Sequence, residues 1–155
     1  MSVPFEIKIV EYPTKQLAGM KIQTNMQKAM EDCPKVWETF MPHMAEVNKE
    51  PKESFGVSVM INENDFEYWA ALEIAPHSPL PDGMQTVGLT SGTYACCTVP
   101  SIEKLGDAYM YLYTTWIQGQ SQSGFVMDSE ANAFERYYDW DPSKPFEIYM
   151  PIKKR

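Results

Sequence analysis

The sequence predicts an α+β fold in which a β-β-α-β-β unit occurs twice within a single domain, residues 1–155. Two amphipathic helical stretches each lie between segments that alternate apolar and polar residues, as half-buried strands do. Matching residues of the two halves recur at a nearly constant offset, 69 residues from Lys35 to Lys104 and 68 from Phe66 to Phe134. We therefore expect a curved, largely antiparallel sheet with both helices on one face and a central cleft between them.

Four strands are expected in the first half. Phe5 to Tyr12 and Gln16 to Thr24 flank a turn at residues 13–15 and are expected to pair as a hairpin. Phe55 to Ile61 and Phe66 to Ala75 are expected as strands on either side of a second turn, of sequence Asn-Glu-Asn-Asp.

The helix of the first half is expected to begin at Asp32 or Cys33, with Pro34 in its first turn. Pro42 lacks the backbone N–H that a helix interior needs, so it should kink or divide this helix. The apolar residues that recur at helical spacing are Val36, Trp37, Phe40, Met41, Met44 and Val47.

The second half is expected to repeat this order after a proline-rich linker at residues 76–83, so that the repeats cover about 1–75 and 84–155. Met84 to Val99, broken near residues 90–92, predicts a second hairpin. Ser101 is expected to cap a helix that ends at Gly119 and whose apolar stripe is Ile102, Leu105, Tyr109, Leu112, Tyr113 and Trp116. The remaining strands are expected at Phe125–Asp128, Ala133–Tyr138 and Phe146–Ile152.

One carboxylate, Glu135, lies in an aromatic stretch of the predicted strand Ala133–Tyr138. Side chains alternate between the two faces of a strand, so Glu135 should share its face with Tyr137, and Arg136 should take the other. An unpaired carboxylate is costly to bury, so Glu135 should reach water or receive a cation. The plain alternative is a solvated carboxylate on an exposed face of the sheet.

Aromatic side chains are expected to line the cleft around Glu135. The match between the halves aligns Glu67 with Glu135 and Trp69 with Tyr137. Four Trp, nine Tyr, seven Phe and eleven Met would suit a pocket that accepts varied shapes, although a Met-rich core is an equal alternative. The expected ligand-binding residues beside Glu135 are Trp37, Phe40, Trp69, Tyr94, Tyr109, Tyr113, Trp116 and Tyr137, with ordinary core packing as the alternative for each helical ring.

The second half carries an ordered set of short motifs: Thr93-Tyr94-Ala95, Ile-Glu-Lys-Leu-Gly-Asp-Ala-Tyr at 102–109, Leu112-Tyr113, Trp116, Phe134-Glu135-Arg136-Tyr137 and Glu-Ile-Tyr-Met-Pro-Ile at 147–152. Together they resemble the GyrI-like family, the effector-binding domain of AraC-type regulators that also occurs free-standing. The resemblance implies a fold that binds amphipathic, often cationic, small molecules between its helices, with Glu135 as the acidic residue facing the ligand. Regulator members carry a helix-turn-helix domain ahead of this one; here strand-like sequence begins at Phe5, and we expect no such domain.

Composition excludes several other functions. A net charge of −8 and a pI of about 4.7 disfavour nucleic acid or an anionic membrane as a direct partner. His43 and His77 stand apart from other ligand residues, so neither a metal nor a cofactor is expected. Three cysteines without a disulfide pattern, and no signal sequence or membrane-spanning stretch, indicate a cytoplasmic protein.

We therefore expect a free-standing protein, monomer or homodimer, that binds, sequesters or senses amphipathic cations, with or without a regulatory protein partner. Two alternatives stay open. Some free-standing relatives are hydrolases of cyclopropane-bearing electrophiles, and Glu135 would then act as a general base assisted by Tyr137 or Tyr113. Gyrase-inhibiting relatives bind a protein instead, and the acidic surface would then matter more than the cleft.

Overall fold

The computed structural model describes residues 5–25, 27–48, 53–75, 78–119, 124–128, 130–138 and 145–154. The elements of the first half are β1 (Ile7–Tyr12), β2 (Lys15–Asn25), α1 (Ala29–Phe40), a 3₁₀ helix (Met41–Glu46), β3 (Glu53–Met60) and β4 (Asp65–Glu73). Those of the second half are β5 (Gln85–Leu89), β6 (Gly92–Val99), a 3₁₀ turn (Ile102–Lys104), α2 (Leu105–Met110), a π-helical turn (Tyr111–Trp116), α3 (Ile117–Gly119), β7 (Phe125–Met127), β8 (Ala133–Tyr138) and β9 (Phe146–Lys154).

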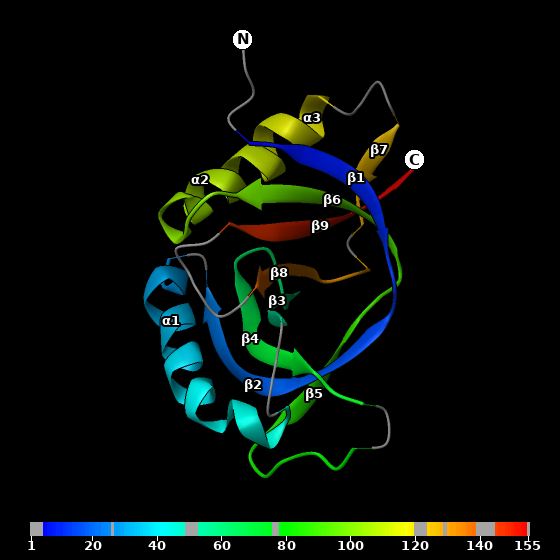
Figure 1. The fold of residues 1–155 in the computed structure, drawn as a ribbon. Helices are drawn as coiled ribbons and strands as arrows, with labels where there is room; N and C mark the ends of the chain where they lie inside the picture. The colour runs from blue at the N-terminus through cyan, green and yellow to red at the C-terminus, as the bar shows by residue number, and fades with distance from the viewer. Residues whose placement is uncertain are drawn as a thin grey trace.

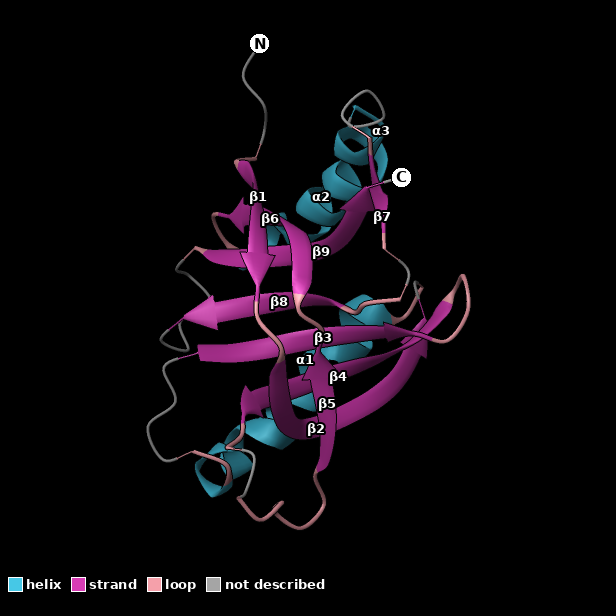
Figure 2. Ribbon diagram, turned by 90° about the vertical axis from the view of Figure 1, so that its right-hand side faces the viewer, coloured by secondary structure: helices cyan, strands magenta, loops and turns pink. Residues whose placement is uncertain are grey.

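All of these strands belong to one curled sheet in the order β1-β6-β9-β8-β3-β4-β2-β5, with β7 paired to β9 (Figure 1, Figure 2). Every pairing is antiparallel. The two helical segments, α1 and the α2–α3 segment, lie on the same side of the sheet, one beside each half (Figure 1). The predicted curved, antiparallel sheet with both helical segments on one side of it is thereby confirmed.

Both predicted hairpins are wrong. β1 pairs with β6, placing Tyr12 opposite Gly92, whereas β2 pairs with β5, placing Lys15 opposite Leu89. Residues 13–14 and 90–91 therefore mark bends between successive strands rather than reversals of the chain. Turn-forming residues predict a break in a strand, but they do not reveal which strand will be its neighbour.

The turn predicted at residues 62–65 is confirmed, and β3 and β4 pair across it as a hairpin. The Asn62 side-chain oxygen accepts hydrogen bonds from the backbone N–H groups of Asn64 and Asp65, at 2.9 and 2.8 Å. This Asx turn reverses the chain and sets Val57 opposite Trp69. The other predicted strands are found within a few residues of their expected ends, and the expected linker falls partly outside the described residues.

Helix α1 begins earlier than predicted. The Asn25 side chain accepts the backbone N–H groups of Gln27 and Lys28, each at 3.0 Å, and so turns the chain into the helix before Asp32 is reached. Asp32 instead accepts a hydrogen bond from the Thr24 hydroxyl at 2.8 Å, which ties the helix to β2. Pro42 has the predicted effect, because the α-helix ends at Phe40 and a 3₁₀ helix follows.

The helical segment of the second half is not one uniform helix. A 3₁₀ turn leads into α2, and a π-helical turn, Tyr111–Trp116, precedes α3. The Thr114 hydroxyl donates to the Met110 carbonyl at 2.5 Å, a side-chain bond that competes for a helical acceptor at this turn. None of the helices that the structure describes is long and apolar enough to cross a lipid bilayer.

Both faces of the sheet are packed. On the outer face, one cluster including Phe40, Phe66 and Tyr68 lies under α1, and a second including Ala108, Ile148 and Met150 lies under α2. The concave inner face is filled by its own aromatic side chains, among them Tyr94, Phe134 and Tyr149. The rings of Phe134 and Tyr149 stack at 4.6 Å between centroids.

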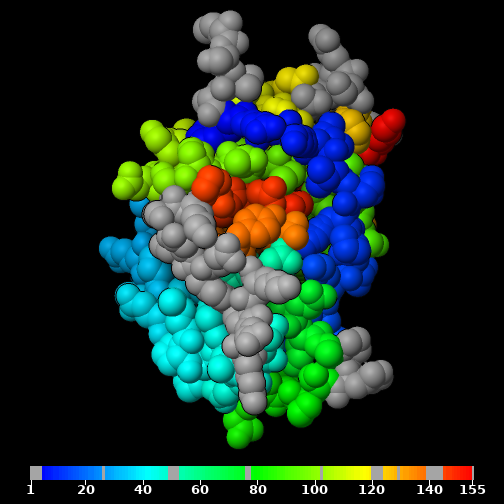
Figure 3. Space-filling view, viewed as in Figure 1, coloured from blue at the N-terminus to red at the C-terminus, as the bar shows by residue number. Residues whose placement is uncertain are grey.

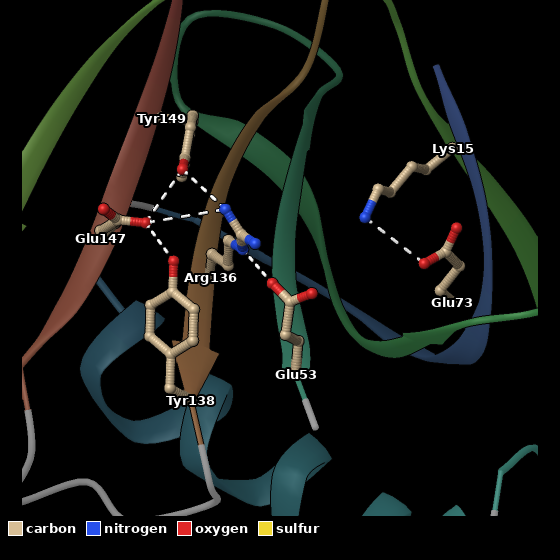
Figure 4. A network of polar contacts seen from close by, with 7 residues as sticks. All are labelled: Lys15, Glu53, Glu73, Arg136, Tyr138, Glu147 and Tyr149. Carbon is tan, nitrogen blue, oxygen red and sulfur yellow. Dashed lines mark hydrogen bonds and ion pairs between the residues drawn. The ribbon is translucent and has the colours of Figure 1, made fainter. Parts of the chain in front are cut away.

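A network of charged residues lies at one edge of this inner core (Figure 4). The Arg136 guanidinium pairs with the Glu53 carboxylate, donates to the Tyr149 hydroxyl at 3.1 Å and lies 4.0 Å from the Glu147 carboxylate. The network links β8 to β3 and β9, and the Arg136 side chain is 26% exposed. In the space-filling view, atoms of β8 and β9 (orange to red) reach the surface between the β1–β6 pair and α1 (Figure 3).

We expect Arg136→Met to lower the free energy of unfolding by about 2–3 kcal/mol, because it leaves the carboxylates of Glu53 and Glu147 without their cation in a partly buried setting. Urea unfolding followed by circular dichroism measures this loss. The control is Lys8→Met, which removes an exposed pair with Glu6 and should change stability by less than about 0.5 kcal/mol. Equal losses in the two variants would show that the network does not stabilise the sheet.

Candidate functional site

Glu135 lies at the middle of β8, with Gly56 of β3 opposite it on one side and Ile148 of β9 on the other. Its neighbour Phe134 points into the inner aromatic core, so Glu135 points to the outer face, which the helices cover. The residue is only 3% exposed. The predicted alternation along this strand is confirmed, and the alternative of a solvated carboxylate is wrong.

Three tyrosine hydroxyls donate to the Glu135 carboxylate. Tyr68 of β4 reaches Oε1 at 2.8 Å, Tyr109 of α2 reaches Oε2 at 2.6 Å, and Tyr137 of β8 also donates to Oε1. Within the part of the chain that the structure describes, no Lys or Arg forms an ion pair with Glu135. The carboxylate is therefore enclosed by hydrogen-bond donors that carry no positive charge.

Burial and hydrogen bonding act on Glu135 in opposite directions. Burial raises the pKa of the Glu135 carboxyl, the hydroxyls of Tyr109, Tyr137 and Tyr68 lower it, and the net result is a raised pKa. The pKa values of the three tyrosines are raised as well, first by burial and then by the negative charge of Glu135. At neutral pH these hydroxyls therefore keep their protons and remain donors.

Helix α1 contributes the Trp37 side chain to the site. Trp37 Nε1 donates to the Tyr68 hydroxyl at 3.0 Å, so Tyr68 accepts one hydrogen bond and donates another to Glu135. The Trp37 ring also meets the Tyr137 ring edge-on, at 5.7 Å between centroids. Cys33 lies on the same helix, and burial, followed by the charge of Glu135, raises the pKa of its thiol to about 12.

The second helical segment contributes a stacked pair of rings. Tyr113, in the π-helical turn, stacks on Tyr109 at 6.1 Å between centroids, and the charge of Glu135 adds to burial in raising its pKa. Tyr137 stacks on Phe146 at 4.7 Å. Trp116 is half-buried and packs against the core under α2.

The structure thus brings Trp37, Tyr109, Tyr113 and Tyr137 together around Glu135, but it separates others of the predicted set. Trp69 and Tyr94 point to the inner core on the opposite face of the sheet, so they are not walls of this site. Phe40 is fully buried between α1 and the sheet, with its ring centroid 6.3 Å from that of Trp37, so it packs in the core.

The predicted match between Glu67 and Glu135 is wrong. Glu67 lies in β4 and its carboxylate pairs with the Lys21 ammonium at 2.8 Å, whereas the strands that neighbour β8 are β3 and β9. By element order β3 corresponds to β8 and β4 to β9, so the match of Phe66 with Phe134 joined strands that are not equivalent. The similar letters Phe-Glu in both segments produced the error.

Sequence reasoning missed two residues of the site. The wrong alignment pairs Trp69 with Tyr137 and so points to Trp69 rather than to its neighbour Tyr68. Gly56, which lies opposite Glu135, gave no signal of its own. The alternation within β4 could have identified Tyr68, since its face also carries Phe66 and Ala70, which pack under α1.

The site is closed around the carboxylate rather than open as a cleft. Glu135 and Tyr68 are 3% and 4% exposed, so a ligand can reach the carboxylate only if tyrosine side chains move aside. A concavity of about 360 Å³ lies elsewhere, against α2, and is lined by Phe5, Pro100, Lys104, Asp107 and Tyr111. Because that concavity holds no carboxylate comparable to Glu135, we centre the site on Glu135.

The raised pKa of Glu135 has a consequence for stability. Its folded-state value lies above the ordinary one, so the stability that the neutral form contributes is full below the ordinary pKa and is lost as the pH rises through the folded-state pKa. Glutamine keeps the shape of the side chain without its titration. We expect Glu135→Gln to gain stability relative to the wild type as the pH is raised from 4 to 8, measured by urea unfolding.

The matched control for this measurement is Glu38→Gln, which removes the same charge from an exposed position on α1. The free energy of unfolding of Glu38→Gln should differ from that of the wild type by a constant amount over the same pH range. If Glu135→Gln also differed from the wild type by a constant amount, the carboxylate would not be held in the environment described above.

Comparison with known proteins gives a consistent result. The Cass2 family model, described as integron-associated effector binding protein, matches residues 8–152. The transcriptional regulator BrlR of Pseudomonas aeruginosa is 23% identical over 154 residues, an alignment that covers 94% of this chain and 54% of BrlR. The chain therefore spans about half the length of that relative.

Two solved structures share the fold. The integron cassette protein VCH_CASS2 of Vibrio cholerae superposes with a TM-score of 0.73 at 14% identity, covering 96% of this chain and 97% of its own. SAV2435, solved bound to tetraphenylphosphonium, gives a TM-score of 0.74 at 18% identity, covering 96% and 94%. The predicted resemblance to effector-binding domains of the GyrI-like fold is confirmed, and the chain belongs to the Cass2 family of integron-associated effector-binding proteins.

Proposed function

We propose that this protein binds amphipathic, cationic small molecules at Glu135, as a ligand-binding, sequestering or sensor protein. The observation that carries the proposal is a carboxylate that is 3% exposed and that receives three hydroxyl hydrogen bonds but, among the described residues, no cation. Such a carboxylate gains more from a positive charge than an exposed one does, because water screens it less.

The side chains around Glu135 suit a bulky organic cation. Trp37, Tyr113 and Tyr137 can present ring faces to a cation that displaces the hydroxyls, and each cation–π contact contributes about 0.5–2 kcal/mol, depending on desolvation. A weakly hydrated cation with apolar substituents loses little on leaving water and gains from burial. The tetraphenylphosphonium bound to the structural neighbour SAV2435 is a cation of this kind, and it supports the same ligand class here.

The decisive experiment compares two ions of the same shape and opposite charge. Quenching of tryptophan fluorescence should be saturable with tetraphenylphosphonium and absent with tetraphenylborate at the same concentrations. At a separation of about 5 Å and an effective dielectric constant of about 20, the attraction of Glu135 for a cation is about 3 kcal/mol. Glu135→Gln should therefore weaken tetraphenylphosphonium binding by at least about tenfold, and up to about a hundredfold.

Glu38→Gln serves as the charge-matched control and should bind tetraphenylphosphonium within about twofold of the wild type, because its exposed charge is screened by water. Isothermal titration calorimetry at a fixed salt concentration gives both constants. Equal affinity of the wild type and Glu135→Gln, or equal binding of the two ions, would refute a cation site at Glu135.

A second function rests on the same geometry. A buried carboxylate with a raised pKa beside tyrosine hydroxyls can act as a general base on water, with a hydroxyl polarising an electrophile. In that case Glu135→Gln would abolish turnover of a cyclopropane-bearing electrophile while leaving its affinity within about twofold. A binding protein shows the reverse, with loss of affinity and no turnover by the wild type, and product analysis by mass spectrometry separates the two.

A further inference from the structure

Gly56 of β3 lies directly opposite Glu135 and is buried. A Cβ atom placed on Gly56 would lie 2.2 Å from the Tyr68 hydroxyl oxygen and 2.8 Å from Glu135 Oε1. Both distances are shorter than any that real Cβ atoms adopt. A side chain at this position would therefore force the Tyr68 hydroxyl and the Glu135 carboxylate out of their present positions.

Backbone conformation does not account for this glycine. The described glycines with positive φ are Gly83, Gly92 and Gly124, and Gly56 is not among them. Glycine in the interior of a strand costs stability, because it has no side chain to pack and loses more conformational freedom on folding. Gly88 of β5 makes a useful contrast, since the nearest atom to a Cβ placed there is 3.9 Å away. At Gly56 the place that a Cβ atom would take is instead occupied by the Tyr68 hydroxyl and the Glu135 carboxylate.

The space is occupied by one end of a hydrogen-bond relay. Trp37 Nε1 on α1 donates to the Tyr68 hydroxyl at 3.0 Å, and that hydroxyl donates to Glu135 Oε1 at 2.8 Å. Tyr68 is 4% exposed, so its hydroxyl cannot turn to water without moving the ring. A methyl group on Gly56 would displace this hydroxyl from the carboxylate and break the link from the helix.

We propose that Gly56 is a positioning residue of the Glu135 site, whose missing side chain lets the Tyr68 hydroxyl hold the carboxylate in the charged form that a cation requires. The structural part of this inference stands alone, whereas its bearing on cations rests on the proposed function. A hydrogen bond to the charged form of a carboxyl group lowers its pKa, and here it opposes the effect of burial. Loss of the Tyr68 hydroxyl therefore raises the pKa of Glu135 further.

The other titratable groups that face Glu135 are unchanged by substitutions at Gly56 and Tyr68. They are Tyr109 from α2, Tyr113 from the π-helical turn, Tyr137 from β8 and Cys33 from α1. Burial and the charge of Glu135 raise the pKa of each of them, so none gains or loses a proton over the range in which Glu135 titrates.

The test measures the titration of Glu135 directly in the ligand-free protein. Carbon-13 NMR of protein labelled at the glutamate side-chain carboxyls gives one signal that disappears in Glu135→Gln. In Tyr68→Phe and in Gly56→Ala we expect the midpoint of that signal to move up by about 0.5–1 pH unit, the equivalent of one hydrogen bond. Gly88→Ala, a strand glycine with open space, should leave the midpoint unchanged.

The double variant shows whether the two substitutions act through the same hydroxyl. In a Tyr68→Phe background, Gly56→Ala should add less to the shift than it does alone, because the group that it displaces is already absent. Should Gly56→Ala fail to fold, Tyr68→Phe removes a single oxygen atom and decides the matter. A midpoint in Tyr68→Phe equal to that of the wild type overturns the proposal.

Binding measurements then separate this proposal from the proposed function. Tyr68→Phe should bind tetraphenylphosphonium more weakly than the wild type at a pH between the two midpoints measured by NMR, and should recover as the pH is raised above the shifted midpoint. A change in packing alone would weaken binding equally at every pH. If the wild type fails to bind tetraphenylphosphonium, the proposed function fails, while the NMR titration still decides the role of Gly56.

Discussion

The contest between burial and hydrogen bonding at one carboxylate governs the site of this protein. Glu135 has lost its contact with water and, within the described chain, has no cation to replace it. Tyrosine hydroxyls from a helix and two strands recover part of the lost solvation, yet burial still prevails and favours the neutral form. A site of this kind works against the stability of the empty protein, which is common where function needs a poorly solvated charge.

The curled sheet makes that environment possible because the two faces of β8 have different surroundings. The inner face packs in the aromatic core, and the outer face carries Glu135. Phe134 and Arg136 of β8 point inward, where stacked rings and an ion-pair network join the strand to β3 and β9. Glu135 and Tyr137 point outward to the helices. The packed inner face therefore holds the strand that carries Glu135, whose hydrogen-bond partners on the outer face come from elements far apart in sequence.

Local patterns in the sequence predicted the structure correctly. Alternation along Ala133–Tyr138 placed Glu135 and Tyr137 on one face, and Pro42 divided the first helix as expected. Prediction failed where the answer depends on which strands become neighbours. The bends at residues 13–14 and 90–91 have the composition of hairpin turns, and only the assembled sheet shows that they are not. The role of Gly56 could not be predicted for a related reason. It depends on the hydroxyl of Tyr68, which lies on the adjacent strand β4 and packs beneath a helix.

The two bends have a consequence for how such a fold arises. Each half gives up its first strand to the other, since β1 pairs with β6 of the second half and β5 pairs with β2 of the first. A single β-β-α-β-β unit would thus lack one edge strand, and two separate copies could complete each other by reciprocal exchange across a two-fold axis. Gene fusion of such an ancestral dimer would yield one chain in which the residues on the axis are free to diverge. The facing pair of Gly56 and Glu135, a void on one strand and a charge on the other, is an asymmetry that identical subunits could not have encoded.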